Sequence, residues 1–185
     1  MNLILLTPQD CSQANIANLT GRRLQHVLDV HQAQVGQQLR VGMLNGLMGN
    51  AEVVHLDKQS LQLRFELDQA PPAKLPLTLL LALPRPKMLK RIFQTVATMG
   101  VERVVLMNSY RVEKSFWDSP FLQPDAIQEQ LILGLEQGKD TILPEIILEK
   151  RFKPFVEDRL ASLAGDSLKL VAHPMAQQSC PRDVQ

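Results

Sequence analysis

Basic side chains gather at one point of the chain, where an apolar strand is predicted to end and a helix to begin. Residues 84–91 read PRPKMLKR. The free N–H groups of a helix start attract phosphate, and Lys and Arg add salt-dependent contacts to the phosphates of a nucleic acid. The alternative is that these cations form the solvated face of an amphipathic helix, and spacing alone favours this alternative. The basic residues of the region are Arg85, Lys87, Lys90 and Arg91, followed after the next predicted strand by Arg111 and Lys114.

A second group of basic residues lies in the first third of the chain. Arg22, Arg23 and Arg40 could form another phosphate-binding strip, with His26 beside them. Asp29 and neighbouring acids offset part of this charge, and His26 is equally compatible with an ordinary position on a helix surface. A structural role is therefore the stronger interpretation of this group.

Motifs for other chemistries are missing from the sequence. It contains no GxGxxG or GxxxxGK[ST] phosphate loop, no GxSxG elbow and no HExxH. The histidines show no metal-ligand spacing, and Cys11 and Cys180 stand alone, so we expect no metal site and assign no catalytic base. Phe116 and Trp117, close to Lys114, could stack a base, but an isolated aromatic pair more often anchors a loop to the core.

The formal net charge of +1 hides a division of charge along the chain. Residues 1–70 carry 5 basic and 6 acidic side chains, residues 71–120 carry 8 and 3, and residues 121–185 carry 7 and 10, which gives −1, +5 and −3. The central block predicts a positive surface that could attract a polyanion. The longest apolar run, residues 79–83, is far shorter than the ~20 residues of a membrane span. The N-terminus shows no signal-peptide pattern, so we expect a cytoplasmic protein without a membrane partner.

Residues 1–70 are predicted to form a small β-rich barrel that carries one short helix. Residues 61–67 alternate apolar and polar side chains, as a half-buried strand does. Asn45-Gly46 favours a tight turn between two strands. The predicted elements of this part are a helix at 23–30 and strands at 38–44, 51–56 and 61–67.

Paired prolines predict a linker at residues 71–76, and a different pattern follows it. From residue 77 to 185, apolar strands alternate with amphipathic helices, which predicts a parallel α/β sheet with right-handed crossovers. The first strand is apolar throughout, as expected for a strand covered on both faces. The predicted strands are 77–83, 101–107, 144–148 and 168–172, and the predicted helices are 86–99, 124–138 and 155–163.

Several short segments occur in an order that is typical of one family. They are RLQHVL at residues 23–28, VGQQL at 35–39, Asn45-Gly46, Lys87-Met88, Met99-Gly100-Val101, Arg111, Glu136-Gln137 and Pro144-Glu145-Ile146. In this order and spacing they resemble the RsmE-type 16S rRNA (uracil-N3) methyltransferases, which join a PUA-like barrel to a SPOUT domain.

The resemblance implies a fold and an activity. The fold is α/β (α+β overall), with a PUA-like, RNA-binding β-barrel at residues 1–70 and a SPOUT-type α/β methyltransferase domain at residues 77–185. The activity is S-adenosylmethionine-dependent methylation of N3 of one uridine in 16S rRNA of the small ribosomal subunit. The enzyme would be a homodimer with a C-terminal trefoil knot.

The sequence departs from the family pattern at identifiable positions. Asp29 and Asp140 stand where the family usually has arginine. The sequence ends at Gln185, before the Gly-Pro-Glu-Gly-Gly loop and the knot. We therefore expect a domain without its knot and an incomplete cofactor pocket, with His173 and Pro174 at the edge of that pocket.

The leading hypothesis from the sequence is an rRNA methyltransferase that lacks its C-terminal knot. One alternative is a non-catalytic rRNA-binding protein derived from this family without the cofactor pocket, and another is a remnant that folds poorly. The residues expected to contact rRNA are Arg22, Arg23, Arg40, Lys87, Lys90, Arg91 and Arg111.

Overall fold

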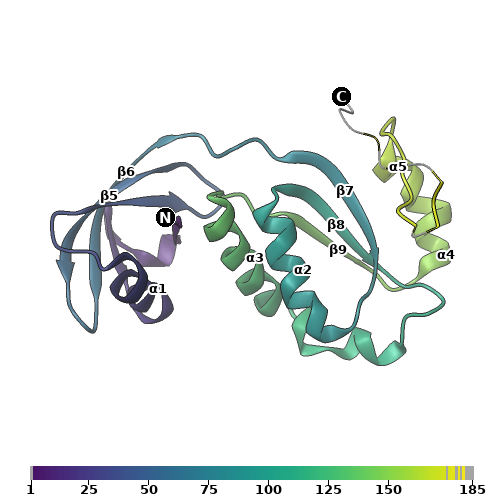
Figure 1. The fold of residues 1–185 in the computed structure, drawn as a ribbon, viewed down its shortest axis with the longest axis horizontal. Helices are drawn as coiled ribbons and strands as arrows, with labels where there is room; N and C mark the ends of the chain where they lie inside the picture. Colours follow the sequence, from purple (N-terminus) through teal and green to yellow (C-terminus); the bar gives the residue numbers. More distant parts are fainter. Residues whose placement is uncertain (1, 174, 178, 180, 182–185) are drawn as a thin grey trace. The chain divides into compact units, whose positions relative to one another are not determined.

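The computed structural model describes residues 2–173, 175–177, 179 and 181, and the chain forms two compact units, residues 1–150 and 151–185. The first unit contains a six-stranded sheet and a three-stranded sheet with its helices (Figure 1). The second unit is a short helical segment with the chain that follows it. None of the helices in the described part is both long enough and apolar enough to cross a membrane.

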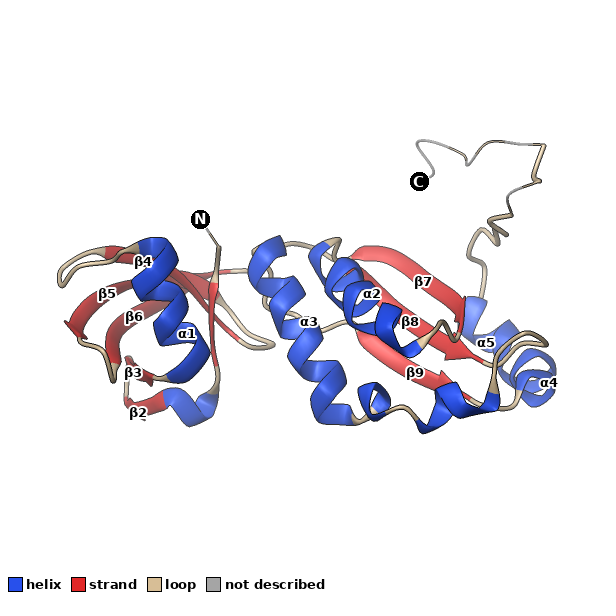
Figure 2. Ribbon diagram, turned by 60° about the horizontal axis from the view of Figure 1, so that its bottom comes forward, coloured by secondary structure: helices blue, strands red, loops and turns tan. Residues whose placement is uncertain are grey.

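A curled six-stranded sheet forms the N-terminal part of the first unit (Figure 2). The strand order is β1-β4-β5-β6-β3-β2, and all neighbours are antiparallel except β1 with β4. Alternation along β6 buries Leu61, Leu63 and Phe65 and exposes Arg64 and Glu66, which confirms this predicted strand. The elements are β1 (Ile4–Leu6), a 3-10 helix (Pro8–Asp10), β2 (Cys11–Gln13), β3 (Ile16–Leu19), α1 (Gly21–His26), a π-helical turn (Val27–His31), β4 (Gln38–Met43), β5 (Met48–Leu56) and β6 (Leu61–Gln69).

The predicted tight turn between β4 and β5 is confirmed. Asn45 adopts a left-handed φ of 58°, and the Gly46 N–H donates to the Met43 carbonyl at 2.8 Å. The predicted helix at 23–30 corresponds to α1 and the π-helical turn together, and Gln32 ends it with a φ of 47°.

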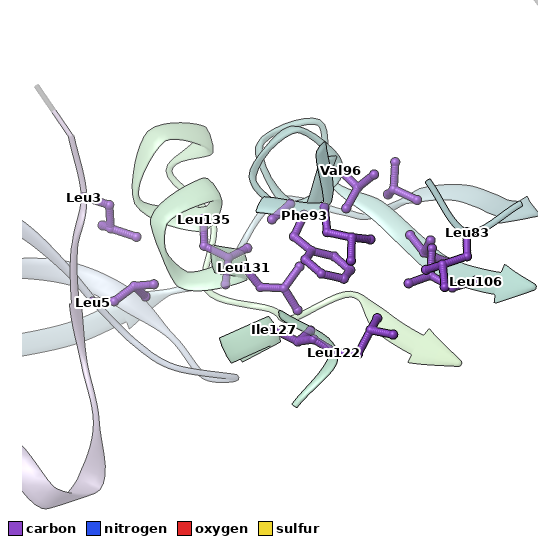
Figure 3. Close-up of a cluster of buried hydrophobic side chains, with 14 of the residues drawn as sticks. Leu3, Leu5, Leu83, Phe93, Val96, Leu106, Leu122, Ile127, Leu131 and Leu135 are labelled. Atoms are coloured by element: carbon purple, nitrogen blue, oxygen red, sulfur yellow. The ribbon is translucent and has the colours of Figure 1, made fainter. Parts of the chain in front are cut away.

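A parallel three-stranded sheet, in the order β7-β8-β9, forms the other half of the first unit. Two right-handed crossovers that step in one direction place both helices on one face of a sheet, and side chains of α2, α3 and all three strands share one core. Figure 3 shows Phe93 of α2 and Leu131 of α3 lying toward each other in this core. The elements are β7 (Leu75–Ala82), α2 (Pro86–Thr98), β8 (Val101–Met107), 3-10 helices at Lys114–Asp118 and Pro120–Leu122, α3 (Pro124–Gly138) and β9 (Glu145–Glu149).

Strand β7 differs from its prediction in two respects. It begins at Leu75, so the connection from β6 is residues 70–74, shorter than the predicted linker at 71–76. The strand tolerates Pro76 because β7 lies at the edge of its sheet. It is not covered on both faces: Leu77 and Leu80 are exposed, while Leu79 and Leu81 pack under the helices. The physical reason is that α2 and α3 occupy the same face.

The curled sheet and the helix layer share contacts within the first unit. The Leu3 N–H donates to the Glu136 carbonyl at 3.0 Å, and the Asn45 N–H donates to the Thr141 carbonyl at 2.8 Å. The Thr141 hydroxyl donates to the Gly46 carbonyl at 2.5 Å. These bonds join the β4–β5 turn and the strand β1 to the end of α3.

The second unit contains one irregular helix. It consists of α4 (Phe152–Pro154), a π-helical turn (Phe155–Arg159) and α5 (Leu160–Ala164), which matches the predicted helix at 155–163. The predicted fourth strand at residues 168–172 is wrong, because these residues form no strand and all of them are exposed. An apolar run becomes a strand only where a neighbour supplies the hydrogen-bond ladder.

Candidate nucleic-acid interface

The carboxyl ends of the three parallel strands meet at one edge of the sheet. The Leu83 N–H donates to the Met107 carbonyl at 2.9 Å, and the Asn108 N–H donates to the Glu149 carbonyl at 3.0 Å. These bonds hold the loop after β7, the loop after β8 and the residue after β9 side by side. In open α/β sheets this edge is where ligands bind. We call it the carboxyl edge.

Helix α2 starts at the carboxyl edge and presents three cations. Pro86 occupies its first turn, and the helix contains no acidic residue. Leu89 and Phe93 point into the core, which leaves Lys87, Lys90 and Arg91 on the exposed side. The spacing of three and four residues places these cations next to each other on the helix. None of the three forms an ion pair with a carboxylate of the residues that the structure describes.

The loop after β8 brings two further cations to the same edge. Arg111 and Lys114 are exposed, and neither is paired with a carboxylate in the described part of the chain. A 3-10 helix places the ring of Phe121 under Lys90, whose Nζ lies 4.7 Å from the ring centroid. This cation–π contact orders a lysine without offsetting its charge. Lys150, directly after β9, lies with its Nζ 5.8 Å from the centroid of the Trp117 ring.

The aromatic pair of this loop anchors it to the core. Phe116 and Trp117 are partly buried and pack against the cluster under α2 and α3. The Trp117 Nε1 donates to the Asn108 Oδ1 at 3.3 Å. These two rings therefore take the structural role that the sequence favoured over base stacking.

Arg22 and Arg23 each form an ion pair within the protein. Arg22 makes two hydrogen bonds to the Glu136 carboxylate, at 2.8 and 2.9 Å, and this contact raises the pKa of Arg22. Arg23 makes two hydrogen bonds to Asp10, at 2.6 and 2.5 Å, and a third to the Leu5 carbonyl at 2.8 Å. Burial alone would raise the pKa of Asp10, but hydrogen bonds from Arg23 and the neighbouring backbone outweigh it and lower that pKa.

Arg40 is also engaged within the curled sheet. Its Nη2 donates to the Gln69 Oε1 at 2.6 Å, which joins β4 to the end of β6. The structure therefore gives each of the three expected cations of the N-terminal part a separate internal partner. It brings together the cations of the central basic block, on α2 and after β8.

The residues expected at a cofactor pocket are only partly described. His173 is exposed and lies in a tight turn, where its Nδ1 accepts from the Met175 N–H at 3.1 Å. Pro174 lies outside the described residues. Residues 168–172 form no strand, so His173 does not follow a strand, and its place at the edge of a cofactor pocket stays a prediction. Among the described residues, no group of three or more His, Cys, Asp or Glu side chains could hold a metal ion.

Two features of the first unit were not predicted from the sequence. Lys150 belongs to the carboxyl edge, and the rule that loops after parallel strands meet at one edge could have found it, because its strand was predicted. The Lys74–Asp140 ion pair, with Nζ and Oδ2 at 2.6 Å, joins residues far apart in the sequence. No sequence signal indicates that pair.

The fold and the interface define an α/β protein that joins a curled sheet to a parallel sheet with a cationic carboxyl edge. Comparison with known proteins gives the family. Residues 71–184 match the model of the RNA methyltransferase domain, and the chain belongs to this family.

Curated relatives carry a more specific name. The chain is 28% identical over 169 residues to "Ribosomal RNA small subunit methyltransferase E" of Treponema pallidum, covering 90% of this chain and 63% of that protein. It is 27% identical over 158 residues to "Ribosomal RNA small subunit methyltransferase E 1" of Borreliella burgdorferi, covering 83% and 63%. The resemblance to RsmE-type methyltransferases is confirmed, and the chain spans about 63% of the length of these relatives.

Solved structures show the same fold. A ribosomal RNA small subunit methyltransferase E of Neisseria gonorrhoeae, bound to S-adenosyl methionine, superposes with a TM-score of 0.61 at 16% identity, covering 80% of this chain and 62% of that chain. A Legionella pneumophila protein in complex with the cofactor SAM gives a TM-score of 0.60 at 20% identity, covering 94% and 70%. At these identities the likeness concerns the fold.

Proposed function

We propose that this protein methylates N3 of a uridine in 16S rRNA of the small ribosomal subunit, with S-adenosylmethionine as the methyl donor. The observation that carries the proposal is a cluster of cations at the carboxyl edge, in an RNA methyltransferase family member, that form no ion pair with the described residues. The names of the two curated relatives support rRNA of the small subunit as the substrate. Uracil-N3 specificity, a homodimer and a cytoplasmic location belong to the same proposal.

The finer assignment of the two sheets is also proposed. The curled sheet corresponds to the PUA-like barrel of the family, at residues 1–70, and the parallel sheet with α2 and α3 corresponds to the SPOUT-type domain. Both assignments are supported by the order of the elements and by the likeness to the solved structures.

The proposed RNA contacts are Lys87, Lys90, Arg91 and Arg111. These side chains are exposed and form no ion pair within the part of the chain that the structure describes, whereas Arg22 and Arg23 are paired with carboxylates. We therefore leave Arg22, Arg23 and Arg40 out of the proposed RNA-binding surface. Phosphate contacts of this kind position an RNA and make its affinity depend on salt.

The proposed reaction requires little covalent chemistry from the protein. Uracil N3 carries a weakly acidic proton, which must pass to solvent water before the N3 lone pair can attack a methyl group. Cations held near the base favour the resulting anion, and positioning supplies much of the remaining rate. S-adenosylmethionine supplies the methyl group when it is bound.

His173 is exposed and its neighbours form no strand, so we assign no step to a cofactor-binding residue. This observation keeps a second candidate function, binding of rRNA without methyl transfer. Calorimetric titration with S-adenosylmethionine separates the two, because only the methyltransferase requires the cofactor to bind.

The RNA-binding surface is tested by the variant Lys87→Ala/Arg91→Ala. Lys90 is left in place because its contact with Phe121 contributes to packing. Each lost phosphate contact lowers the slope of log affinity against log salt by about 0.7 to 0.9, so the double variant should lower it by about 1.5. The measurement is affinity for a 16S rRNA fragment at several salt concentrations.

The matched control is Lys58→Ala/Arg64→Ala. It also removes two exposed cations, but from the curled sheet, where Arg64 is paired with Glu52 at 3.4 Å. Its salt slope should equal that of the unmodified protein. Equal slopes for both double variants would contradict the proposed surface.

A further inference from the structure

The chain's single tyrosine lies at the tip of the loop after β8. The Val112 N–H donates to the Ser109 carbonyl at 3.0 Å, which closes a β-turn with Tyr110 and Arg111 at its two corners. The relative exposure of Tyr110 is 102%, so both faces of its ring are open to solvent. Among the described residues of the first unit, no phenylalanine or tryptophan has an exposed side chain.

The turn that carries Tyr110 is fixed on both sides. Before it, the Asn108 N–H is bonded to the Glu149 carbonyl and the Asn108 side chain is bonded to Trp117. After it, Val112 packs against the core under α2 and α3. The ring therefore projects from a held backbone, which lowers the ordering cost of binding through it.

The surroundings of the ring match one kind of partner. Arg111 is adjacent in the turn, Lys114 follows, and the cations of α2 share the carboxyl edge, while the acids of the loop are Glu113 and Asp118. A nucleic acid combines phosphates, which need cations, with flat bases, which need an aromatic face. Double-helical RNA keeps its bases stacked inside, so an exposed ring can reach only an unpaired base.

We propose that Tyr110 stacks on an unpaired base of the RNA substrate while the neighbouring cations hold its phosphates. The inference rests on the proposed function and adds to it a specific residue and a single-stranded RNA target. It also differs from the expectation for Phe116 and Trp117, because those rings are anchored in the core.

The test is the binding of a uridine-rich, single-stranded RNA of about 12 nucleotides to the full chain. Removing a stacking ring weakens binding by about 5- to 150-fold per base, so Tyr110→Ala should show a loss in this range. Tyr110→Phe retains the ring and should stay within about 2-fold. The salt slope of Tyr110→Ala should equal that of the unmodified protein, because stacking releases no counterions.

A direct probe follows from the single tyrosine. Incorporating 3-fluorotyrosine labels position 110 alone, and its ¹⁹F resonance should move upfield when a base stacks on the ring. An RNA of the same length in which abasic sites replace the bases should leave the resonance unchanged. It should also abolish the affinity difference between Tyr110→Ala and the unmodified protein.

The outcomes separate this inference from the proposed function. Unchanged affinity of Tyr110→Ala, together with a lowered salt slope of Lys87→Ala/Arg91→Ala, would overturn base stacking and keep the RNA-binding surface. Failure of the unmodified protein to bind any of these RNAs would overturn both proposals. A loss in Tyr110→Ala that persists with the abasic RNA would also refute stacking.

Discussion

Replacing Asp140 by alanine should destabilise the first unit strongly. Only 3% of Asp140 is exposed, and its Oδ2 accepts from the Lys74 Nζ at 2.6 Å. The other oxygen, Oδ1, accepts from the N–H groups of Thr141 and Ile142, at 2.6 and 3.0 Å. The Lys74 ammonium also donates to the Ile142 carbonyl. The pair thus joins the connection between β6 and β7 to the segment after α3.

The expected magnitude comes from the burial of both partners. Lys74 has 14% of its side chain exposed, so Asp140→Ala leaves an ammonium without its carboxylate in a largely dry position. Breaking such a buried pair costs about 3 to 5 kcal/mol. A domain of this size has about 5 to 15 kcal/mol of stability, so the loss is a large fraction of the total. Asp140→Asn, which keeps an acceptor for the two N–H groups, should lose less.

Urea unfolding at equilibrium measures the effect, with Glu145→Ala as the control. Glu145 also pairs with an arginine, Arg103, at 2.5 Å, but its side chain is 54% exposed, so its loss should cost less than about 1 kcal/mol. In a double-mutant cycle, Asp140→Asn and Lys74→Met should cost less together than the sum of the single changes. A loss below about 1 kcal/mol for Asp140→Ala would refute the argument, because it would make this pair equivalent to a solvated one.

Two further changes probe the packing of the first unit. Gly134→Ala should lower the melting temperature, although alanine is the better helix former. The Cβ of the new alanine would lie 2.3 Å from the Gln94 carbonyl oxygen and 2.7 Å from the Ala97 Cβ. The control Gln137→Ala, at an exposed site on the same helix, should leave the melting temperature almost unchanged. For His31, burial and the adjacent His26 lower the pKa, so the unfolded chain binds more protons just below pH ~6.5 and stability should fall as the pH falls through this window. Urea midpoints measured across the window should decline less in His31→Gln, and an equal decline in both proteins would contradict the assignment.

The parts of the fold that depend on local pattern could be predicted from the sequence. Alternation predicted the faces of β6. The apolar spacing of α2 correctly predicted Leu89, Phe93 and Val96 on its buried side, but it also predicted Met88 and Met99 there, and both are exposed. The cations of α2 could be predicted for the same reason, because the residues left over by a buried stripe are exposed. The carboxyl edge then follows from the parallel strand order.

The parts that depend on distant neighbours could not be predicted. An apolar run such as residues 77–83 or 168–172 does not say which face is covered or whether a neighbouring strand exists. The first run became an edge strand with one covered face, and the second formed no strand. Likewise, the partner of Arg22 is 114 positions away, at Glu136, so its role in an ion pair could not be inferred from spacing.

Pairing explains how basic residues of one type serve different purposes in the two halves of the first unit. Arg22 and Arg23 each hold a carboxylate through two hydrogen bonds, so their charge is offset within a few ångströms and their contribution is to folding. Lys87 and Arg91 have no such partner among the described residues, and their charge acts on the solvent and on any polyanion that approaches. The net charge of +1 therefore describes neither half. Ion pairs offset the charge of Arg22 and Arg23 in the curled sheet, whereas the cations of α2 keep theirs at the carboxyl edge.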